Sequence, residues 1–491
     1  MAFIYYQTMA EVINEIEIAS IKRKSVKGVM ALTSRTFLLQ IIAFVATFLL
    51  TIFLTPEVFG VFYLVSAFIS FLGYFSDIGL AAALIQKKEE LTSDDLATTF
   101  TVQQILVLTI SILAFAGSGY FGSFYRLDAS GVWLIRALII SFFLSSLKTI
   151  PSILLERRLE FNKLVVPQIA ETLGFYIVAV VLAARGYGVA SFVWAVLVRA
   201  VVGLLGIYLV SPWRISIGVS LPVARKLMRF GIPFQLNSFL ALLKDDLLTI
   251  VLGKILTLTE IGYIGWAKKW AEVPLRLIMD SVIRVTFPMY ARLQNSKETL
   301  KKAIDNTLFA LAALLLPIST GLLFFVGPAI FLIPKYAKWE PALMSFYLFV
   351  VTAAIAAFST TLTNALNAIG KIRQTLNLMI LWTILGWVFT LLFVHVFGFV
   401  GVALALFVIS GTIVLVIMLV RRFVDIAIVE NFRTPLLGVL LQGGWYVTML
   451  SSPPYSWLGL TGVAMVGVIL YGVVLWVFER KRIVKLYETN A

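Results

Sequence analysis

The chain has 491 residues, of which 60% are hydrophobic and 13% are charged, and its mean hydropathy is +0.98. Soluble domains carry about 45–50% apolar and about 25% charged residues, so lipid must surround most of this chain. The sequence contains no Cys and a single His, His395, which excludes disulfide frameworks, thiol catalysis and nearly all zinc chemistry.

Residues 1–27 are predicted to form a cytoplasmic N-terminal segment and not a signal peptide. The first 20 residues contain three Glu and no basic residue, and no cleavage-type sequence follows an apolar core. A short amphipathic helix on the membrane surface and a frayed tail both fit this segment.

Fourteen apolar stretches follow, and each approaches the roughly 20 residues that a membrane-spanning helix needs. In chain order they cover residues 28–54, 58–75, 96–116, 132–150, 164–184, 189–210, 230–252, 259–282, 307–333, 341–365, 376–397, 400–420, 434–450 and 457–477. The eighth is the weakest because of its charges. We therefore predict an all-α, polytopic membrane protein with 14 transmembrane helices.

Basic residues orient these helices, because cytoplasmic loops are enriched in Lys and Arg. With the N-terminus inside, the inside segments hold 28 basic residues and the outside loops hold 5. Both termini are therefore predicted to lie inside. The formal net charge of +15 is explained by this topology, so we expect no nucleic-acid partner.

Two short phrases recur along the chain. LTPEVFGVFYL begins at Leu54 and LTLTEIGYIGW at Leu256, while GYGVASFVWAVLV begins at Gly186 and GFVGVALALFVIS at Gly398. Helices one to six and seven to twelve therefore form two parallel copies of one unit, which typically place a substrate path at their interface. The predicted domains are an N-lobe at 28–210, a C-lobe at 211–422, and helices thirteen and fourteen with a cytoplasmic tail at 423–491.

Longer stretches carry a family likeness. They are LTPEVFGVFYLVSAFISFLGYFSDIGLAAALIQKK, PSILLERRLEFNK, RFGIPFQLNSF and FPMYARLQNSKETLKKA. In these stretches the chain resembles the Wzx-type polysaccharide flippases of the multidrug/oligosaccharidyl-lipid/polysaccharide (MOP) superfamily, and it looks closest to the branch that handles colanic-acid-like and teichuronic-acid-like repeat units. The likeness extends in order from about Lys22 to Lys481.

The resemblance implies a fold and a function. The fold would be two six-helix lobes in a V-shaped arrangement like that of the multidrug exporters, plus two extra helices. The protein would flip polyprenyl-diphosphate-linked oligosaccharide repeat units to the outer leaflet of the cytoplasmic (inner) membrane by alternating access. Synthesis of lipopolysaccharide, capsule or exopolysaccharide would follow, through other polysaccharide-assembly proteins. The chain would be a monomeric transporter and not an enzyme, with no cofactor.

Seven basic residues lie inside predicted spans, where a charge costs at least about 2.5–3.5 kcal/mol on insertion scales. A diphosphate-linked substrate needs cations along its path. The predicted substrate-binding residues are Arg35, Arg136, Arg199, Lys244, Lys268 and Lys269. Other roles stay open: Arg136 and Arg199 also fit snorkelling or helix packing, and the helix-eight cations, including Arg276, also fit pairs with Glu272 and Asp280.

Three buried acids are candidates for energy coupling. Glu171, Asp245 and Asp246 lie inside predicted spans, and each is a candidate for binding H⁺ or Na⁺. Lys244, Asp245 and Asp246 are consecutive and cover about 200° of an α-helix, so at least one is expected to face a central cavity.

Two other classes of function compete with the flippase. An ion-coupled multidrug antiporter of the same superfamily is the first, but the intramembrane charge of the first lobe is mainly basic. A membrane polysaccharide polymerase or glycosyltransferase is the second, but the predicted outside loops are short. The P-loop pattern is absent from the sequence, which argues against ATP hydrolysis by this chain as the energy source for transport.

Overall fold

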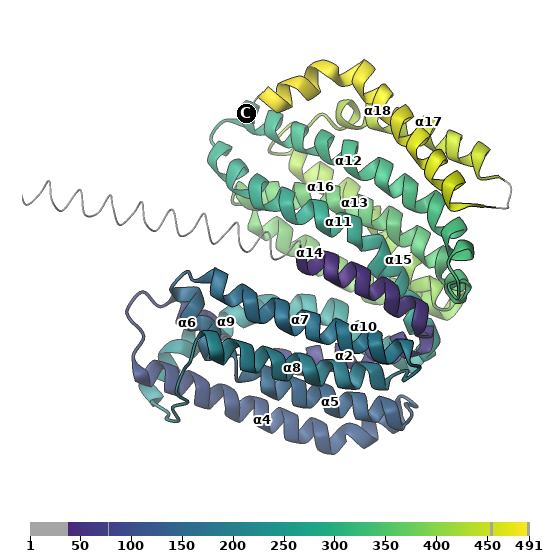
Figure 1. The fold of residues 1–491 in the computed structure, drawn as a ribbon. Coiled ribbons are helices and arrows are strands. Elements are labelled where there is room, and N and C mark those ends of the chain that lie inside the picture. Colours follow the sequence, from purple (N-terminus) through teal and green to yellow (C-terminus); the bar gives the residue numbers. More distant parts are fainter. Residues whose placement is uncertain (1–37, 77, 452–454, 489–491) are drawn as a thin grey trace, which may run out of the picture. The chain divides into compact units, whose positions relative to one another are not determined.

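The computed structural model describes residues 38–76, 78–451 and 455–488. Within these ranges helices are the only regular elements, which confirms the all-α prediction. The chain divides into two compact units, Met1–Ile255 and Leu256–Ala491 (Figure 1). The predicted N-terminal segment and Arg35 lie outside the described residues.

Among its described residues, the first unit contains a short apolar helix, Leu38–Phe53, and ten further helical elements. These are α2 (Pro56–Tyr74), α3 (Leu80–Gln86), α4 (Ser93–Phe124), α5 (Ala129–Ser146), α6 (Thr149–Arg157), α7 (Phe161–Ala184), α8 (Ala190–Val210), α9 (Leu221–Leu242), the π-helical turn η1 (Leu243–Leu247) and α10 (Leu248–Ile255).

The second unit contains eight α-helices and one short 3₁₀-helix among its described residues. These are α11 (Leu258–Leu293), α12 (Lys297–Leu332), the 3₁₀-helix η2 (Ala337–Ala342), α13 (Leu343–Ala368), α14 (Ile372–Phe397), α15 (Val400–Ser410), α16 (Ile413–Arg421), α17 (Ile428–Met449) and α18 (Trp457–Glu488).

Ten of the described helical segments are long and apolar enough to cross a membrane, so the chain is a multi-pass membrane protein. The other four predicted spans are also helical where the structure describes them, but they are shorter, interrupted or more polar. They are the Leu38–Phe53 helix, the α9–α10 segment, α11 and α17. The count of 14 spans and the inside location of both termini therefore remain predictions.

The recurring phrases adopt the same local structure in both copies. Thr55 is the N-cap of α2 and Thr257 is the N-cap of α11, and each side chain accepts a hydrogen bond from a backbone N–H three residues later. Gly186 and Gly398 both have positive φ, 83° and 59°, in the turns before α8 and α15. The first repeat is therefore a helix-start signal, and the second is a turn that favours Gly.

The α9–α10 segment packs within the first unit. Gly79 and Gly231 meet so closely that a Cβ on Gly79 would lie 2.2 Å from the Gly231 carbonyl oxygen. One turn further along, the Tyr74 hydroxyl donates to the Gln235 carbonyl at 2.7 Å, and the Gln235 amide donates to the Tyr74 carbonyl at 3.0 Å. Residues up to Ile255 thus extend the first unit beyond the predicted end of the N-lobe, while the division by sequence repeat stays a prediction.

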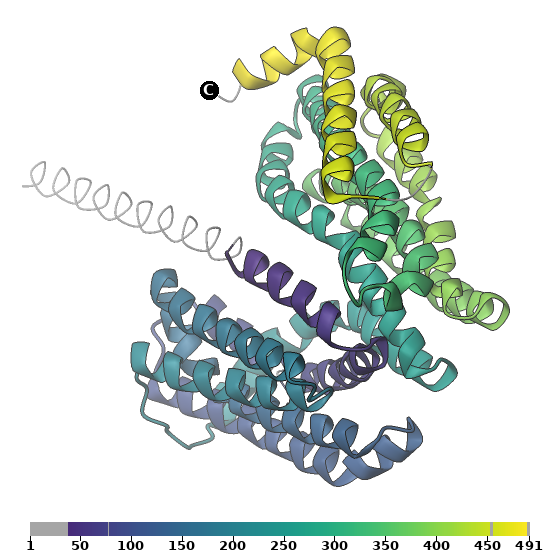
Figure 2. The same cartoon turned by 45° about the vertical axis from the view of Figure 1, so that its right-hand side comes forward.

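The last two helices lie side by side (Figure 2) and each receives a tyrosine ring from the other. A Cβ on Gly438 of α17 would lie 2.7 Å from the Tyr471 ring of α18, and one on Gly467 of α18 would lie 2.2 Å from the Tyr446 ring of α17. In membranes small residues at such contacts let helices approach closely, because lipid supplies no hydrophobic drive between them.

A buried polar cluster fixes the same pair to α12. The Asp305 carboxylate accepts from the Ala427 backbone N–H at 2.9 Å and from the Asn431 side-chain amide at 2.7 Å. The Arg482 guanidinium donates to the Asn431 side-chain oxygen at 2.6 Å and lies 4.2 Å from the centroid of the Phe309 ring. Each group in this cluster has a partner, as buried polar groups require.

We predict that Gly467→Ala lowers the thermal stability of the detergent-solubilised protein by about 1–3 kcal/mol, because the added methyl overlaps the Tyr446 ring. Gly472→Ala, on the same helix with open space around it, is the control and should be neutral or slightly stabilising. Equal melting temperatures for the two variants would contradict the close packing of α17 and α18.

Candidate functional site

Arg199 lies near the middle of α8 on the side away from the apolar stripe. Trp194, Val201 and Leu205 are exposed and form that stripe, whereas Arg199 lies about 140° round the helix from Trp194 at the α-helical step. Arg199 is itself exposed within the described structure. Because a charge facing lipid at this depth costs several kcal/mol, this face of α8 must meet water or a polar partner.

Aromatic side chains of α7 lie next to Arg199. The Arg199 guanidinium lies 6.0 Å from the centroid of the Phe175 ring. Tyr176 interacts electrostatically with Arg199, and its hydroxyl hydrogen-bonds with Thr47 of the Leu38–Phe53 helix. The surroundings of Arg199 therefore combine a cation with aromatic and hydroxyl groups, which suits a ligand with phosphate and sugar groups.

An ion pair lies one helical turn further along α8. The Lys148 ammonium and the Glu171 carboxylate are 2.6 Å apart, with only 20% and 13% of their side chains exposed. A Cβ on Gly203 would lie 2.0 Å from the Glu171 oxygen and 2.9 Å from the Lys148 nitrogen. Gly203 thus makes room for the pair against the backbone of α8. Lys148 lies near the inner end of the span predicted over 132–150 and was not among the predicted substrate-binding residues.

Asp246 lies in the π-helical turn η1, where the sequence predicted one regular helix over 230–252. Its carboxylate accepts from the Ser70 hydroxyl of α2 at 2.9 Å. π-Helical turns inside α-helices are frequent at functional sites. The estimate that Lys244, Asp245 and Asp246 cover about 200° of the helix assumed α-helical spacing. The wider π-helical turn does not have that spacing, so the estimate does not apply. The side chains of Lys244 and Asp245 lie outside the described ones.

Arg136 is placed differently from Arg199. It shares a stripe of α5 with the exposed Trp133 and Ile140, which are three and four residues away. Its Nε donates to the Ser118 hydroxyl of α4 at 3.1 Å, and its guanidinium lies 5.2 Å and 5.3 Å from the ring centroids of Trp133 and Phe115. The structure does not bring Arg136 to the Arg199 face, and its substrate role stays a prediction.

The remaining predicted cations belong to α11 of the second unit. Lys268 and Lys269 are half-buried, and both have interaction partners within the structure. The same holds for Glu272, while the side chains of Arg276 and Asp280 lie outside the described ones. The substrate role of the two lysines therefore remains a prediction beside the alternative of an internal pair.

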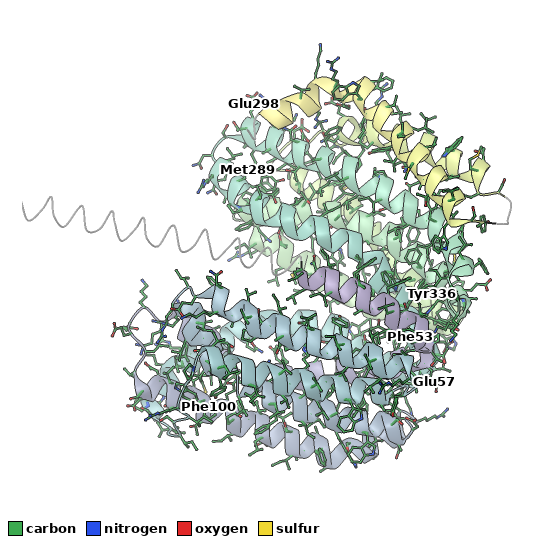
Figure 3. All side chains as sticks on the ribbon, viewed as in Figure 1. Phe53, Glu57, Phe100, Met289, Glu298 and Tyr336 are labelled. Carbon is green, nitrogen blue, oxygen red and sulfur yellow. The ribbon has the colours of Figure 1, made fainter. Side chains whose placement is uncertain are left out.

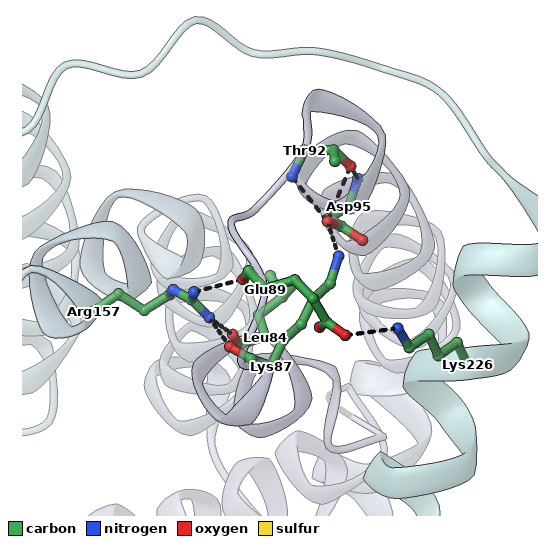
Figure 4. Close-up of polar contacts among 7 residues, drawn as sticks. All are labelled: Leu84, Lys87, Glu89, Thr92, Asp95, Arg157 and Lys226. Carbon is green, nitrogen blue, oxygen red and sulfur yellow. Dashed lines mark hydrogen bonds and ion pairs between the residues drawn. The ribbon is translucent and has the colours of Figure 1, made fainter. Parts of the chain in front are cut away.

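A second polar cluster joins loop ends on the predicted cytoplasmic side of the first unit (Figure 4). Arg157 donates to three backbone carbonyls, those of Leu84, Lys87 and Glu89, at 2.7, 2.6 and 2.9 Å. Lys87 also pairs with Asp95 at the start of α4. One side chain thereby holds the end of α3 and the loop leading to α4.

Glu89 extends this cluster to α9 through Lys226, at 3.6 Å. The backbone N–H of Glu89 and the nearby Lys226 ammonium keep the pKa of the Glu89 carboxyl below its usual value. Both side chains are exposed, so the pair itself contributes little to stability. Within the described residues no group of three or more His, Asp or Glu side chains is placed to hold a metal ion.

Comparisons with known proteins agree with this architecture. The family model described as "polysaccharide biosynthesis protein" matches residues 49–344. The succinoglycan biosynthesis transport protein ExoT of Rhizobium meliloti (strain 1021) is 25% identical over 332 residues, 67% of this chain and 66% of the relative. The lipopolysaccharide biosynthesis protein WzxC of Escherichia coli (strain K12) is 23% identical over 314 residues, 62% of each chain.

A third relative is the teichuronic acid biosynthesis protein TuaB of Bacillus subtilis (strain 168), 25% identical over 250 residues, 50% of this chain and 51% of the relative. The matches span about half to two thirds of the length of these three relatives.

Two solved structures show the same fold. The lipid II flippase MurJ in an inward closed conformation gives a TM-score of 0.75 at 15% identity, covering 92% of this chain and 99% of MurJ. An inward-facing multidrug resistance transporter of the MATE family gives 0.58 at 16% identity, covering 82% of this chain and 94% of the transporter. Both have the fold class predicted from the sequence. At 15% and 16% identity the likeness is evidence for the fold alone.

We predict that Lys148→Met destabilises the protein by about 3 kcal/mol, because it leaves the Glu171 carboxylate without its partner in a largely buried place. Combining it with Glu171→Gln should restore most of the loss, as measured by thermal unfolding in detergent. Lys302→Met is the control, since it breaks the exposed Lys302–Glu298 pair and should cost less than about 1 kcal/mol. Additive losses in the double variant would rule out a direct Lys148–Glu171 interaction.

Proposed function

This chain belongs to the polysaccharide biosynthesis protein family, and from that premise we propose that it flips lipid-linked oligosaccharides across the cytoplasmic membrane. The substrate would be an oligosaccharide repeat unit on a polyprenyl diphosphate, moved from the inner to the outer leaflet for polysaccharide assembly. Its relatives are named as transport and biosynthesis proteins for succinoglycan, teichuronic acid and lipopolysaccharide, and MurJ, whose fold it shares, is named a lipid II flippase.

The exposed Arg199 is the single observation that carries this proposal. A diphosphate that leaves water needs a cation with several directed donors, and a guanidinium offers five. Arg199 lies near the middle of α8, away from the apolar stripe, where it is open to a ligand. The half-buried Tyr176 lies beside it and can contact a sugar ring, while the buried Phe175 ring packs behind the guanidinium. Alternating access would then expose this face to one side of the membrane at a time.

Coupling to H⁺ or Na⁺ is a further part of the proposal. Asp246 accepts a hydrogen bond from the Ser70 hydroxyl at a π-helical turn, and hard cations such as Na⁺ prefer oxygen ligands of this kind. Glu171 pairs with Lys148 at 2.6 Å, so binding of H⁺ or Na⁺ at Glu171 would have to displace the lysine. Asp245 stays a candidate on its position alone.

A multidrug antiporter is the second candidate, and the fold shared with a MATE transporter favours it. Antiporters for cationic drugs need acidic groups on the substrate path. In the first unit, the described Glu171 is neutralised by Lys148, while Arg199 stays exposed. This charge balance favours an anionic substrate. No feature of the described residues specifically favours the alternative of a membrane polymerase or glycosyltransferase.

The test is complementation of a deletion strain with matched arginine variants. Wild type should restore lipid-linked repeat units at the outer leaflet. Arg199→Ala should lower their amount roughly 10- to 100-fold, because a charge-assisted hydrogen bond contributes about 1.5–3 kcal/mol. Arg199→Lys should lose less. The control is Arg185→Ala, an exposed arginine at the C-terminal end of α7, which should transport close to the wild-type level.

The readout is the fraction of repeat units that an impermeant labelling reagent reaches in spheroplasts, normalised to the amount of transporter in the membrane. If the deletion leaves this fraction unchanged and alters only drug tolerance, the antiporter is the better assignment. If both arginine variants fail equally, Arg199 has no special role.

A further inference from the structure

The segment between α8 and α9, residues 211–220, forms no helix or strand and lies against α4; we call it the linker. The backbone N–H groups of Gly218 and Ser220 donate to the hydroxyls of Thr101 and Thr98 at 3.1 and 3.0 Å. Trp213 meets the Phe100 ring edge to face at 5.1 Å, and Phe100 is labelled in Figure 3. The linker is therefore fixed to α4 by its backbone and by one aromatic contact.

The linker has one face on α4 and one apolar face outward. Gly218 lies over Ala97, because a Cβ on Gly218 would be 3.7 Å from the Ala97 methyl. Ile215, Ile217 and Val219 are 55%, 80% and 51% exposed. Three branched apolar side chains thus stand unpartnered in a row.

The position of the linker on α4 indicates what surrounds the exposed side chains of Ile215, Ile217 and Val219. Thr98 and Thr101 lie at helical spacing from Ile105, Leu108 and Ile112, so all five share one side of α4. The last three are exposed and apolar on a helix long enough to cross the membrane, which makes this side lipid-facing. The linker covers the end of that stripe, where the helix turns polar, and its own apolar row continues the stripe.

The depth of the contact agrees with the lipid boundary. α4 has 32 residues and is about 48 Å long, whereas the hydrocarbon core is about 30 Å thick. Its first turns, which carry Thr98 and Thr101, therefore reach the headgroup region. Arg214 is exposed beside the apolar row, where its guanidinium can meet lipid phosphates.

The geometry points to the linker as an interfacial membrane anchor. Ile215, Ile217 and Val219 insert at the boundary between headgroups and acyl chains of the leaflet on the predicted cytoplasmic side, and Arg214 binds lipid phosphate. α9 begins at Leu221, directly after the linker, so the anchor fixes where α9 enters the membrane. The occupant of the apolar row is lipid, and this inference does not depend on the transported substrate.

Single cysteines test this directly, because the natural sequence contains none. A nitroxide label is attached to Ile217→Cys in full-length protein, reconstituted in vesicles of phosphatidylcholine and phosphatidylglycerol. Collision with oxygen and with a water-soluble nickel chelate is measured by electron paramagnetic resonance. Ile112→Cys on the α4 stripe is the lipid control, and Asn295→Cys in the exposed turn between α11 and α12 is the water control.

The label at position 217 should favour oxygen over nickel, with a depth between those at positions 112 and 295. A label at position 215 or 219 should behave in the same way. Nickel accessibility equal to that at position 295 would place the linker in water and overturn the anchor. A label at position 217 that is immobilised and shielded from both reagents would show a protein partner on the row, and would also overturn it.

Discussion

A charge in the middle of a spanning helix must find another charge, an aromatic ring or water, because lipid offers it no partner. The described spans of the first unit show three solutions. Lys148 and Glu171 pair with each other in the space left by Gly203. Arg136 stays on an apolar stripe and is held by a hydroxyl and two rings. Arg199 is turned away from the stripe of its helix and stays exposed. Only the third solution leaves a cation able to receive a ligand.

The helices of each unit are joined by contacts that do not rely on a hydrophobic drive. Glycine contacts bring backbones together at Gly79 with Gly231, and they seat tyrosine rings at Gly438 and Gly467. Polar clusters hold the helix ends. In the first unit, Arg157 donates hydrogen bonds to three backbone carbonyls. In the second unit, Asp305 joins α12 to α17. Within each unit, helices that are distant in the sequence are thus joined by close backbone approach and by polar contacts.

Patterns that are local in the sequence predicted the fold well. Apolar runs marked the helices, and the recurring LT phrases marked helix starts capped by Thr55 and Thr257. What the spacing of residues did not reveal were contacts between distant segments, such as Ser70 with Asp246 and Lys148 with Glu171. The exposed residues of their own helices separate Arg136 from Arg199, but both helices are apolar on nearly all sides, so the sequence does not mark which residues are exposed. The π-helical turn at η1 is not marked in the sequence either, because it depends on the packing of α2 against it.

The ion pair and the exposed arginine are linked through α8. Gly203 follows Arg199 by one helical turn, so the pair that lies on Gly203 also fixes how α7 packs against the Arg199 face. Phe175 follows Glu171 by one turn on α7, and its ring is the one that Arg199 approaches. The neutral pair thereby orients the aromatic neighbour of the free cation without competing for an anion. The proposed uptake and release of a diphosphate by Arg199 would gain from this separation, because a carboxylate within reach of the guanidinium would hold it in the resting state.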